Sequence, residues 1–546
     1  ELVIVLTSAV SMVGLTLLHR RGYFRQHLDP DGMQTESPSA WNPEEKLEPL
    51  STEVSITLEG RCVRIRTWRY QVEGVTGHTI PVYFLDTDVE GNDPWDRTLT
   101  GQLYGGDDRY RLCQEAVLGI GGVAVLQARG HVGDLQHHMN EGHSALLTLA
   151  LLSRRLRDRG LGEADESDVE AVRAHCIFTT HTPVPAGHDK FPLDLVRKVL
   201  GDERTDTLER LGCLDDSTLN MTYLALRFSR YINGVAMQHG EVSRDMFPRF
   251  PITAITNGVH AVTWTSPPFQ QLFDRHISAW RRDNVYLRYA LKIPLEEIRA
   301  THLEAKRVLL DEINKRNGVH LEESVFTIGY ARRATLYKRA DLIFQDKERL
   351  RGIVSNVGAL QIVFAGKAHP HDDPGKEMIH RIFEAAEHLD AELKVVYLED
   401  YDMDLAKRII PGVDMWLNTP RRPQEASGTS GMKAALNGVP SLSVLDGWWI
   451  EGHQEGVTGW AFGDCAGCDA DTPGEIESLY NRLEKVIIPL FYQQPNDYAK
   501  VMRNAIALNG SFFNTQRMVL QYLTNAYFPA NQPPSPKLEE PVPSPK

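Results

Sequence analysis

The sequence predicts an α/β protein with two parallel sheets that are covered by helices. In the second half, short apolar runs alternate with helical patterns, and the runs lie at residues 325–330, 361–365, 394–398, 413–417 and 441–445. Strands that alternate with helices form parallel sheets, whose functional residues gather at the carboxyl ends of the strands. A length of 546 residues exceeds what one core usually holds, which favours two domains. Three period-two runs, at 54–58, 63–67 and 80–85, predict an antiparallel insertion in the first half.

The α/β pattern starts anew after Trp264, which sets the predicted domain boundaries. We expect a first Rossmann-like domain at residues 1–262 and a second at 263–528. Residues 27–53 are polar, acidic and contain proline, so we expect a long loop there. Residues 529–546, with a repeated PSPK, lack apolar residues to pack and are expected to be disordered.

Composition limits the class of partner and the compartment. The net charge of −14 argues against nucleic acid or an anionic membrane as the main partner. Six cysteines in so long a chain form no disulfide framework, which fits a reducing cytoplasm. Cys465 and Cys468 make a lone CxxC that we interpret as ordinary thiols, and no metal site is expected. The apolar run at 2–18 is short for a membrane span and precedes its basic residues, so we expect a buried helix and strand.

One segment, residues 425–451, places a lysine beside a candidate phosphate site. A turn of small residues, ASGTSG, joins the strand at 413–417 to a helical run at 432–437. Small residues let backbone N–H groups approach an anion, and a helix N-terminus favours negative charge. Lys433 lies in the first turn of that run. An amine beside a phosphate site is what pyridoxal phosphate requires, so this cofactor is the natural hypothesis.

Cations and polar loops supply further candidates at the ends of predicted strands. Arg332, Arg333, Lys338 and Arg339 follow the strand at 325–330, where guanidinium forks would suit phosphate oxygens. Taken alone, such a stretch is more often a solvated helix start. His143, His181 and Asn257 lie in polar loops of the first half, and residues of these types at strand ends are usually structural.

The long segments TPRRPQEASGTSGMKAALNG and LDGWWIEG resemble the cofactor-binding signature of α-glucan phosphorylases. The version here is similar to the bacterial and archaeal branch of this family, which acts on glycogen, starch or maltodextrin. The likeness extends over nearly the whole chain apart from the tail, for example through NGVAMQHGE at 233–241 and LEDY at 398–401. It implies two Rossmann-like domains that face each other across a cleft, as in glycosyltransferases of the B type.

The resemblance also assigns roles to individual residues. It implies that Lys433 carries pyridoxal 5′-phosphate, with Arg332, Lys338, Gly428, Thr429, Tyr401 and Trp264 around the cofactor. Arg333 and Lys338 match the contacts to the substrate phosphate. His143, His181, Asn257, Tyr337, Glu425, Ser427 and Gly428 match positions that contact the sugar. Arg332 departs from the pattern, because the better-known members carry lysine there.

The implied reaction is phosphorolysis of a terminal α-1,4-linked glucose, which gives α-glucose 1-phosphate with retained configuration. The cofactor's phosphate would exchange a proton with the substrate phosphate, since its second pKa lies near 6. The implied partners are an α-glucan and inorganic phosphate, and a homodimer is common in the family. Two alternatives stay open: a catalytically impaired, cofactor-binding pseudoenzyme with a glycan-binding or regulatory role, and a nucleotide-sugar glycosyltransferase. The latter has no use for Lys433 as a cofactor anchor.

The start of the sequence affects the expectation for activity. Family members carry a glycine-rich, phosphate-binding loop and a tyrosine upstream of the part that Gly14 onward matches. This sequence begins at Glu1 without methionine, so we expect a fragment or a processed product. If it were the entire polypeptide, impaired catalysis and poor folding would be expected.

Overall fold

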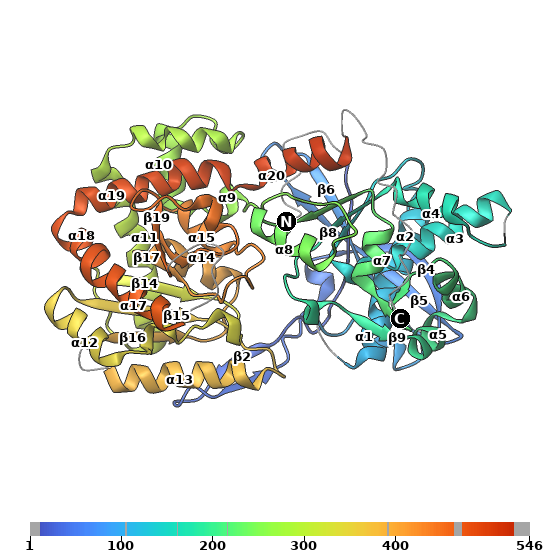
Figure 1. Cartoon of the computed structure of the whole chain (residues 1–546), viewed down its shortest axis with the longest axis horizontal. Coiled ribbons are helices and arrows are strands. Elements are labelled where there is room, and N and C mark those ends of the chain that lie inside the picture. Colours follow the sequence, from blue (N-terminus) through green and yellow to red (C-terminus); the bar gives the residue numbers. More distant parts are fainter. Residues whose placement is uncertain are drawn as a thin grey trace, which may run out of the picture.

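The computed structural model describes residues 11–103, 106–160, 162–215, 217–389, 393–463 and 472–528. The chain forms two halves that lie side by side (Figure 1), each built around a parallel sheet. The predicted disordered tail at 529–546 and the CxxC cysteines lie outside the described residues. No helix in the described ranges is long and apolar enough to cross a membrane.

The second half contains a six-stranded parallel sheet in the order β16-β15-β14-β17-β18-β19. Its strands are β14 (Phe326–Ala331), β15 (Leu360–Ala365), β16 (Lys394–Leu398), β17 (Met415–Asn418), β18 (Ser441–Val444) and β19 (Gly459–Phe462). Every residue of β14, β15, β17, β18 and β19 is buried, as expected for strands with helices on both faces. The five strands predicted for this half are therefore confirmed.

The first half contains a four-stranded parallel sheet and an antiparallel insertion. The parallel sheet has the order β13-β12-β8-β7, with β7 (His137–Asn140), β8 (Cys176–Thr179), β12 (Tyr231–Gly234) and β13 (Ile252–Ala254). The insertion is formed by β4 (Glu48–Leu58), β5 (Arg61–Glu73) and β6 (Thr79–Asp86), and β1 (Gly14–Leu17) adds to it parallel to β6. A short sheet of β9 (Lys190–Pro192), β10 (Leu214–Asp215) and β11 (Thr218–Asn220) lies nearby in the chain. The predicted α/β class and antiparallel strands are confirmed.

Helices connect the strands of both sheets. Those of the first half are α1 (Asp108–Ala116), α2 (Gly122–Ala128), α3 (Leu147–Arg159), α4 (Glu166–Arg173), α5 (Leu193–Leu200), α6 (Asp202–Arg210), α7 (Met221–Arg227) and α8 (Met237–Met246). Those that follow are α9 (Ala261–Trp264), α10 (Pro267–His276), α11 (Leu295–Asn317), α12 (Lys347–Asn356), α13 (Asp373–Leu389), α14 (Met403–Gly412), α15 (Ser430–Ala435), α16 (Trp449–Gly452), α17 (Thr472–Arg482), α18 (Ile488–Gln493), α19 (Pro495–Asn504) and α20 (Thr515–Tyr522).

The loop predicted at residues 27–53 is wrong, because this segment contains a hairpin and the start of β4. The hairpin pairs β2 (Arg25–Leu28) with β3 (Gln34–Ser37). Its inward side chains are glutamines that donate hydrogen bonds across to the second half, from Gln26 Nε2 to Gly366 O (2.8 Å) and from Gln34 Nε2 to Ala368 O (2.8 Å). Because these inward side chains are amides that bond to a backbone distant in the sequence, the two strands show no alternation of apolar and polar residues. The sequence pattern therefore could not predict them.

The chain crosses between the halves at both ends of the described region. The β2–β3 hairpin lies along the second half near α13, and α20 returns to the first half near β6 (Figure 1). In α20, Met518, Val519 and Tyr522 are buried in one cluster with Ile177 of β8 and Val82 of β6. The predicted boundary at residue 262 remains a proposal, and the return of α20 shows that the halves exchange elements.

A buried ion group fixes the amino ends of β14 and β17. Asp414 accepts from Lys306 Nζ (2.6 Å), from His302 Nε2 (2.9 Å) and from the Thr327 backbone N–H (2.7 Å). Lys306 also donates to Val325 O (2.7 Å), and only 1% of the Lys306 residue is exposed. These bonds tie α11 to two adjacent strands whose opposite ends lead into the candidate site.

Replacing Lys306 with methionine should destabilise the protein by about 3 kcal/mol, because Asp414 would lose its main buried counter-charge. The free energy of unfolding in urea measures this loss. Arg307→Met on the same helix is the control, since its pair with Glu323 is exposed and should contribute below about 1 kcal/mol. Equal effects of the two substitutions would contradict a special role for the buried group.

Candidate active site

A buried carboxylate between two cations forms the centre of the candidate site. Arg332 directly follows β14, Lys338 ends a short 3₁₀ turn (Leu336–Lys338), and Glu425 lies in the loop between β17 and α15. Glu425 Oε2 accepts from Arg332 Nη2 (2.5 Å) and from Lys338 Nζ (3.2 Å). The side chains of Glu425, Arg332 and Lys338 are 11%, 7% and 9% exposed, so solvent screens the charges of this group little.

Burial and charge move the pKa values of this group in opposite directions. Burial opposes ionisation of Glu425, yet Arg332 and Lys338 hold the Glu425 pKa at about 2. Burial, together with the charge of Arg332, lowers the Lys338 pKa to about 7 despite the neighbouring carboxylate. Lys338 therefore titrates near neutral pH, and an additional anion would favour its charged form.

Several buried polar atoms around this group have no hydrogen-bond partner among the described residues. They are Arg332 Nη1, Thr335 Oγ1 and Ser427 Oγ. Buried donors are normally satisfied, so these three atoms are candidates for contact with a polar ligand. A guanidinium nitrogen and two hydroxyls are suitable donors for phosphate or sugar oxygens.

Lys433 lies in α15 with its amine against an aromatic face. Its Nζ is 3.7 Å from the centroid of the Trp264 ring, and burial lowers the Lys433 pKa to about 8. Asn437 holds the two segments together, because its Nδ2 donates to Trp264 O (2.8 Å) and to Lys433 O (2.9 Å). A lysine with a lowered pKa presents more neutral amine, the form that attacks an aldehyde. Tyr401 packs in the same apolar cluster as Trp264.

The helix carrying Lys433 differs from the sequence expectation. We expected it at residues 432–437, but it spans Ser430–Ala435, with Thr429 as its N-cap residue. Six residues make too short a helix for a strong dipole, so side-chain cations are the main attraction for an anion. Gly428 has φ +72°, a conformation that glycine adopts without strain.

Two further predicted residues of the second half, Tyr337 and Arg333, are more exposed than the two buried cations beside Glu425. Tyr337 is half-buried beside Lys338, whose Nζ is 4.9 Å from the ring centroid. Arg333 is exposed. Burial raises the Tyr337 pKa to about 12 while the Arg333 charge opposes that rise, and the same charge adds to the lowering of the Lys338 pKa by burial. Arg333 is therefore close enough to add charge to the same anion.

The predicted residues of the first half also follow strands of a parallel sheet. His143 comes after β7, His181 after β8 and Asn257 after β13. His181 Nε2 forms a hydrogen bond with Asn140 Oδ1 (2.7 Å), while burial is the main cause of a lowered pKa at His143. Asn257 is buried, and its carbonyl accepts from Arg517 Nη2 (2.9 Å).

Two acidic residues to which the sequence analysis assigned no role, Asp446 and Glu451, hold the loops that carry Glu425 and Asn257. Asp446, after β18, accepts from the backbone N–H of Glu425 (3.0 Å) and of Gly447 (2.9 Å), and burial raises its pKa to about 7. Glu451 joins the halves, because it accepts from the Met237 N–H (3.0 Å) and the Thr256 hydroxyl (2.7 Å). The position of Asp446 immediately after a buried strand was the signal available in the sequence.

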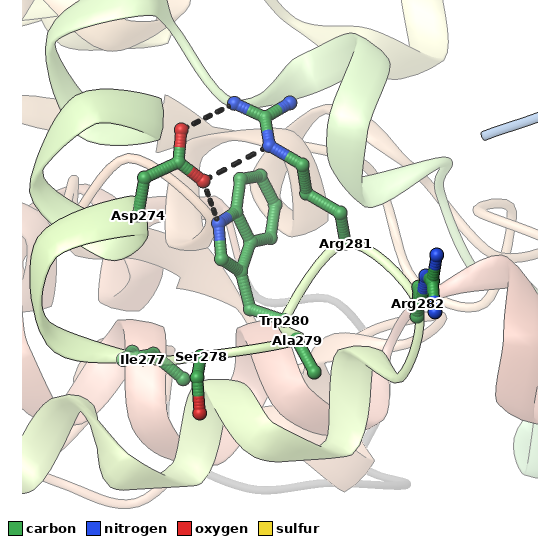
Figure 2. Close-up of a pocket in the computed structure, with 7 residues that line it drawn as sticks. All are labelled: Asp274, Ile277, Ser278, Ala279, Trp280, Arg281 and Arg282. Atoms are coloured by element: carbon green, nitrogen blue, oxygen red, sulfur yellow. Dashed lines mark hydrogen bonds and ion pairs between the residues drawn. The ribbon is translucent and has the colours of Figure 1, made fainter.

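The surface pocket in Figure 2 is separate from this site. It has a volume of about 380 Å³ and is lined by Asp274 and residues 277–282. Arg281 pairs with Asp274 (2.8 Å), which also accepts from the Trp280 indole (2.7 Å). It contains no residue of the predicted site.

Anion affinity should fall as pH rises. The anion binds the protonated form of Lys338, whose pKa is about 7, so above pH 7 a growing fraction of the protein must take up a proton in order to bind. Sulfate, which stays dianionic, should bind about tenfold more weakly per pH unit above 7. Calorimetric titration between pH 6 and 9 measures this. Asp446 and Lys433 titrate in the same range, so Lys338→Met provides the reference. A pH slope in Lys338→Met equal to that of the wild type would contradict the prediction.

Known proteins resemble this chain over most of its length. A family model described as carbohydrate phosphorylase matches residues 201–465. The maltodextrin phosphorylase of Thermococcus litoralis is 39% identical over 95% of this chain and 66% of its own length. The glycogen phosphorylase of Mycobacterium tuberculosis is 34% identical over 96% of this chain and 67% of its own length. That of Aquifex aeolicus is 35% identical over 94% of this chain and 80% of its own length. The chain thus spans about two thirds of the first two relatives. It belongs to the carbohydrate phosphorylase family.

Proposed function

We propose that the protein transfers the terminal α-1,4-linked glucose of an α-glucan to inorganic phosphate and releases α-glucose 1-phosphate. The observation that carries this proposal is a half-buried Lys433, whose amine lies against the Trp264 ring, in the same half as a buried cation group with unpaired donors. The names of the relatives, maltodextrin and glycogen phosphorylase, support this class of reaction.

The residues present fit pyridoxal 5′-phosphate. Lys433 would hold the aldehyde carbon, Trp264 and Tyr401 would pack near the ring, and Arg332, Lys338, Gly428 and Thr429 would receive the phosphate arm. When bound, the cofactor supplies a phosphate whose second pKa near 6 suits proton exchange at neutral pH. The orphaned Arg332 Nη1 and Ser427 Oγ are protein atoms available to such a group.

The cation group would bring two phosphates together. Two unit charges about 4–5 Å apart repel by about 4 kcal/mol at an effective dielectric near 20, and two dianions repel about four times as strongly, so uncompensated approach is unfavourable. Arg332, Arg333 and Lys338 offset this repulsion. Glu425 offsets part of the charge of Arg332 and Lys338 and stays ionised, so its carboxylate would also favour positive charge at an anomeric carbon.

Residues of both halves would bind the sugar. His143, His181 and Asn257 from the first half, with Tyr337, Ser427 and Gly428 from the second, offer donors and acceptors for glucose hydroxyls. Glu451 holds the Asn257 loop against the second half, which supports joint action of the two sets. A homodimer and a cytoplasmic location remain part of the proposal.

The alternatives differ in their need for Lys433. A nucleotide-sugar glycosyltransferase has no use for Lys433 as a cofactor anchor. A pseudoenzyme would keep the cofactor site without the reaction, and the two experiments below separate it from the active enzyme.

Pyridoxal phosphate should attach to Lys433 and to no other lysine after borohydride reduction. Peptide mass spectrometry should find the pyridoxyl group on the peptide that contains Lys433. Lys433→Ala should lose the near-ultraviolet band, whereas Lys407→Ala, at a side chain of α14 that is 38% exposed, should keep it. A full band in Lys433→Ala would refute the cofactor assignment.

Maltodextrin and phosphate together should yield glucose 1-phosphate, and neither should suffice alone. Glu425→Gln should lower kcat about 100-fold or more, because it removes the negative charge that stabilises the transition state. Glu163→Gln, at a side chain 80% exposed, should leave kcat unchanged. Cofactor binding without glucose 1-phosphate release would instead identify a pseudoenzyme.

A further inference from the structure

Glu141 has a backbone conformation that nearly always requires glycine. Its φ is +75° and its ψ is 166°, a region that is costly for any residue with a Cβ atom. Glu141 follows β7 directly, and its own N–H donates to Thr179 O at the end of β8 (2.9 Å). A strained residue persists only when its surroundings enforce the conformation, and such residues cluster at functional sites.

The Glu141 carboxylate holds the loop that carries His181. Its Oε2 accepts from the His181 backbone N–H (2.5 Å) and from the Thr182 hydroxyl (3.2 Å), while its Oε1 accepts from the Gly142 N–H (3.3 Å). The preceding residue, Asn140, bonds the His181 ring (2.7 Å). Residues 140 and 141 therefore fix both the backbone and the imidazole of His181.

From this geometry we propose that Glu141 is a positioning residue, whose strained backbone aims its carboxylate at the His181 loop and so sets the sugar-binding imidazole. The proposal rests on the proposed function, in which His181 contacts the glucose. Glycine at position 141 would relieve the strain but would leave the His181 N–H and the Thr182 hydroxyl without this acceptor. The chain thus carries a conformational cost at the position where a side-chain acceptor is needed.

The test exploits the opposite effects of Glu141→Gly on stability and activity. Relief of strain should leave the melting temperature unchanged or raised, while loss of the acceptor should lower kcat/KM about 100-fold, as small misplacements of binding groups do. Ala279 has φ +66° in the exposed loop that lines the pocket of Figure 2. Ala279→Gly is therefore the matched control, expected to keep both the melting temperature and kcat/KM of the wild type or to raise the former.

Glu141→Gln tests the carboxylate without changing the backbone preference. Its single carbonyl oxygen can replace only part of the acceptor set, so an intermediate kcat/KM is expected. A cycle with His181→Ala tests whether Glu141 acts through the imidazole. If it does, kcat/KM of the double variant Glu141→Gly/His181→Ala should be little lower than that of His181→Ala alone.

The outcomes separate this proposal from the proposed function. A wild type without phosphate-dependent glucose 1-phosphate release overturns the proposed function itself. With an active wild type, full kcat/KM in Glu141→Gly overturns the positioning role, as does a loss that adds in full to that of His181→Ala. A fall in melting temperature that matches the loss of activity identifies a merely structural residue and also overturns it.

Discussion

The pairing of Glu425 with Arg332 and Lys338 is the interaction on which the candidate site depends. Two cations buried without a partner would be strongly unfavourable, and the carboxylate makes their burial tolerable. The charges do not cancel, because one carboxylate faces two cations. The exposed Arg333 adds a third positive charge. A site in this state attracts further negative charge while staying folded without it.

The parallel sheets determine where these groups meet. Arg332 follows β14 and Glu425 follows β17, and these strands are neighbours in the six-stranded sheet. Their amino ends are fixed by the buried Asp414 group, so the opposite ends emerge in a defined register. Position at the carboxyl ends of adjacent strands thus brings together residues 93 positions apart in the sequence.

Sequence patterns predicted the parts of the fold that bury apolar strands. The strand expected at 394–398 has those bounds, and the one expected at 325–330 is β14, Phe326–Ala331. The hairpin at Gln26 and Gln34 was missed because its contacts are amide-to-backbone bonds with residues more than 300 positions away. Such pairings depend on the tertiary structure and leave no local periodicity.

The site shows the same limit. Lys433, Glu425 and Lys338 could be singled out because charged residues beside strand ends are informative and the resemblance extends over long motifs. Asp446 and Glu141 also follow strands, but their roles could not be predicted, because these depend on which backbone N–H groups of other loops reach the two carboxylates. Asp446 holds the backbone of Glu425, and Glu141 holds that of His181.

Each half therefore uses a carboxylate from one strand end to fix the loop that follows a neighbouring strand. Asp446 follows β18 and holds the loop after β17, while Glu141 follows β7 and holds the loop after β8. Glu451 then bonds the segment after β18 to Met237 and Thr256 of the first half. Asp446 and Glu141 therefore position site residues within their own halves, and Glu451 bonds the two halves to each other. In all three cases the carboxylate accepts from backbone N–H or hydroxyl groups of other loops, so its contribution to the site is to the position of those loops.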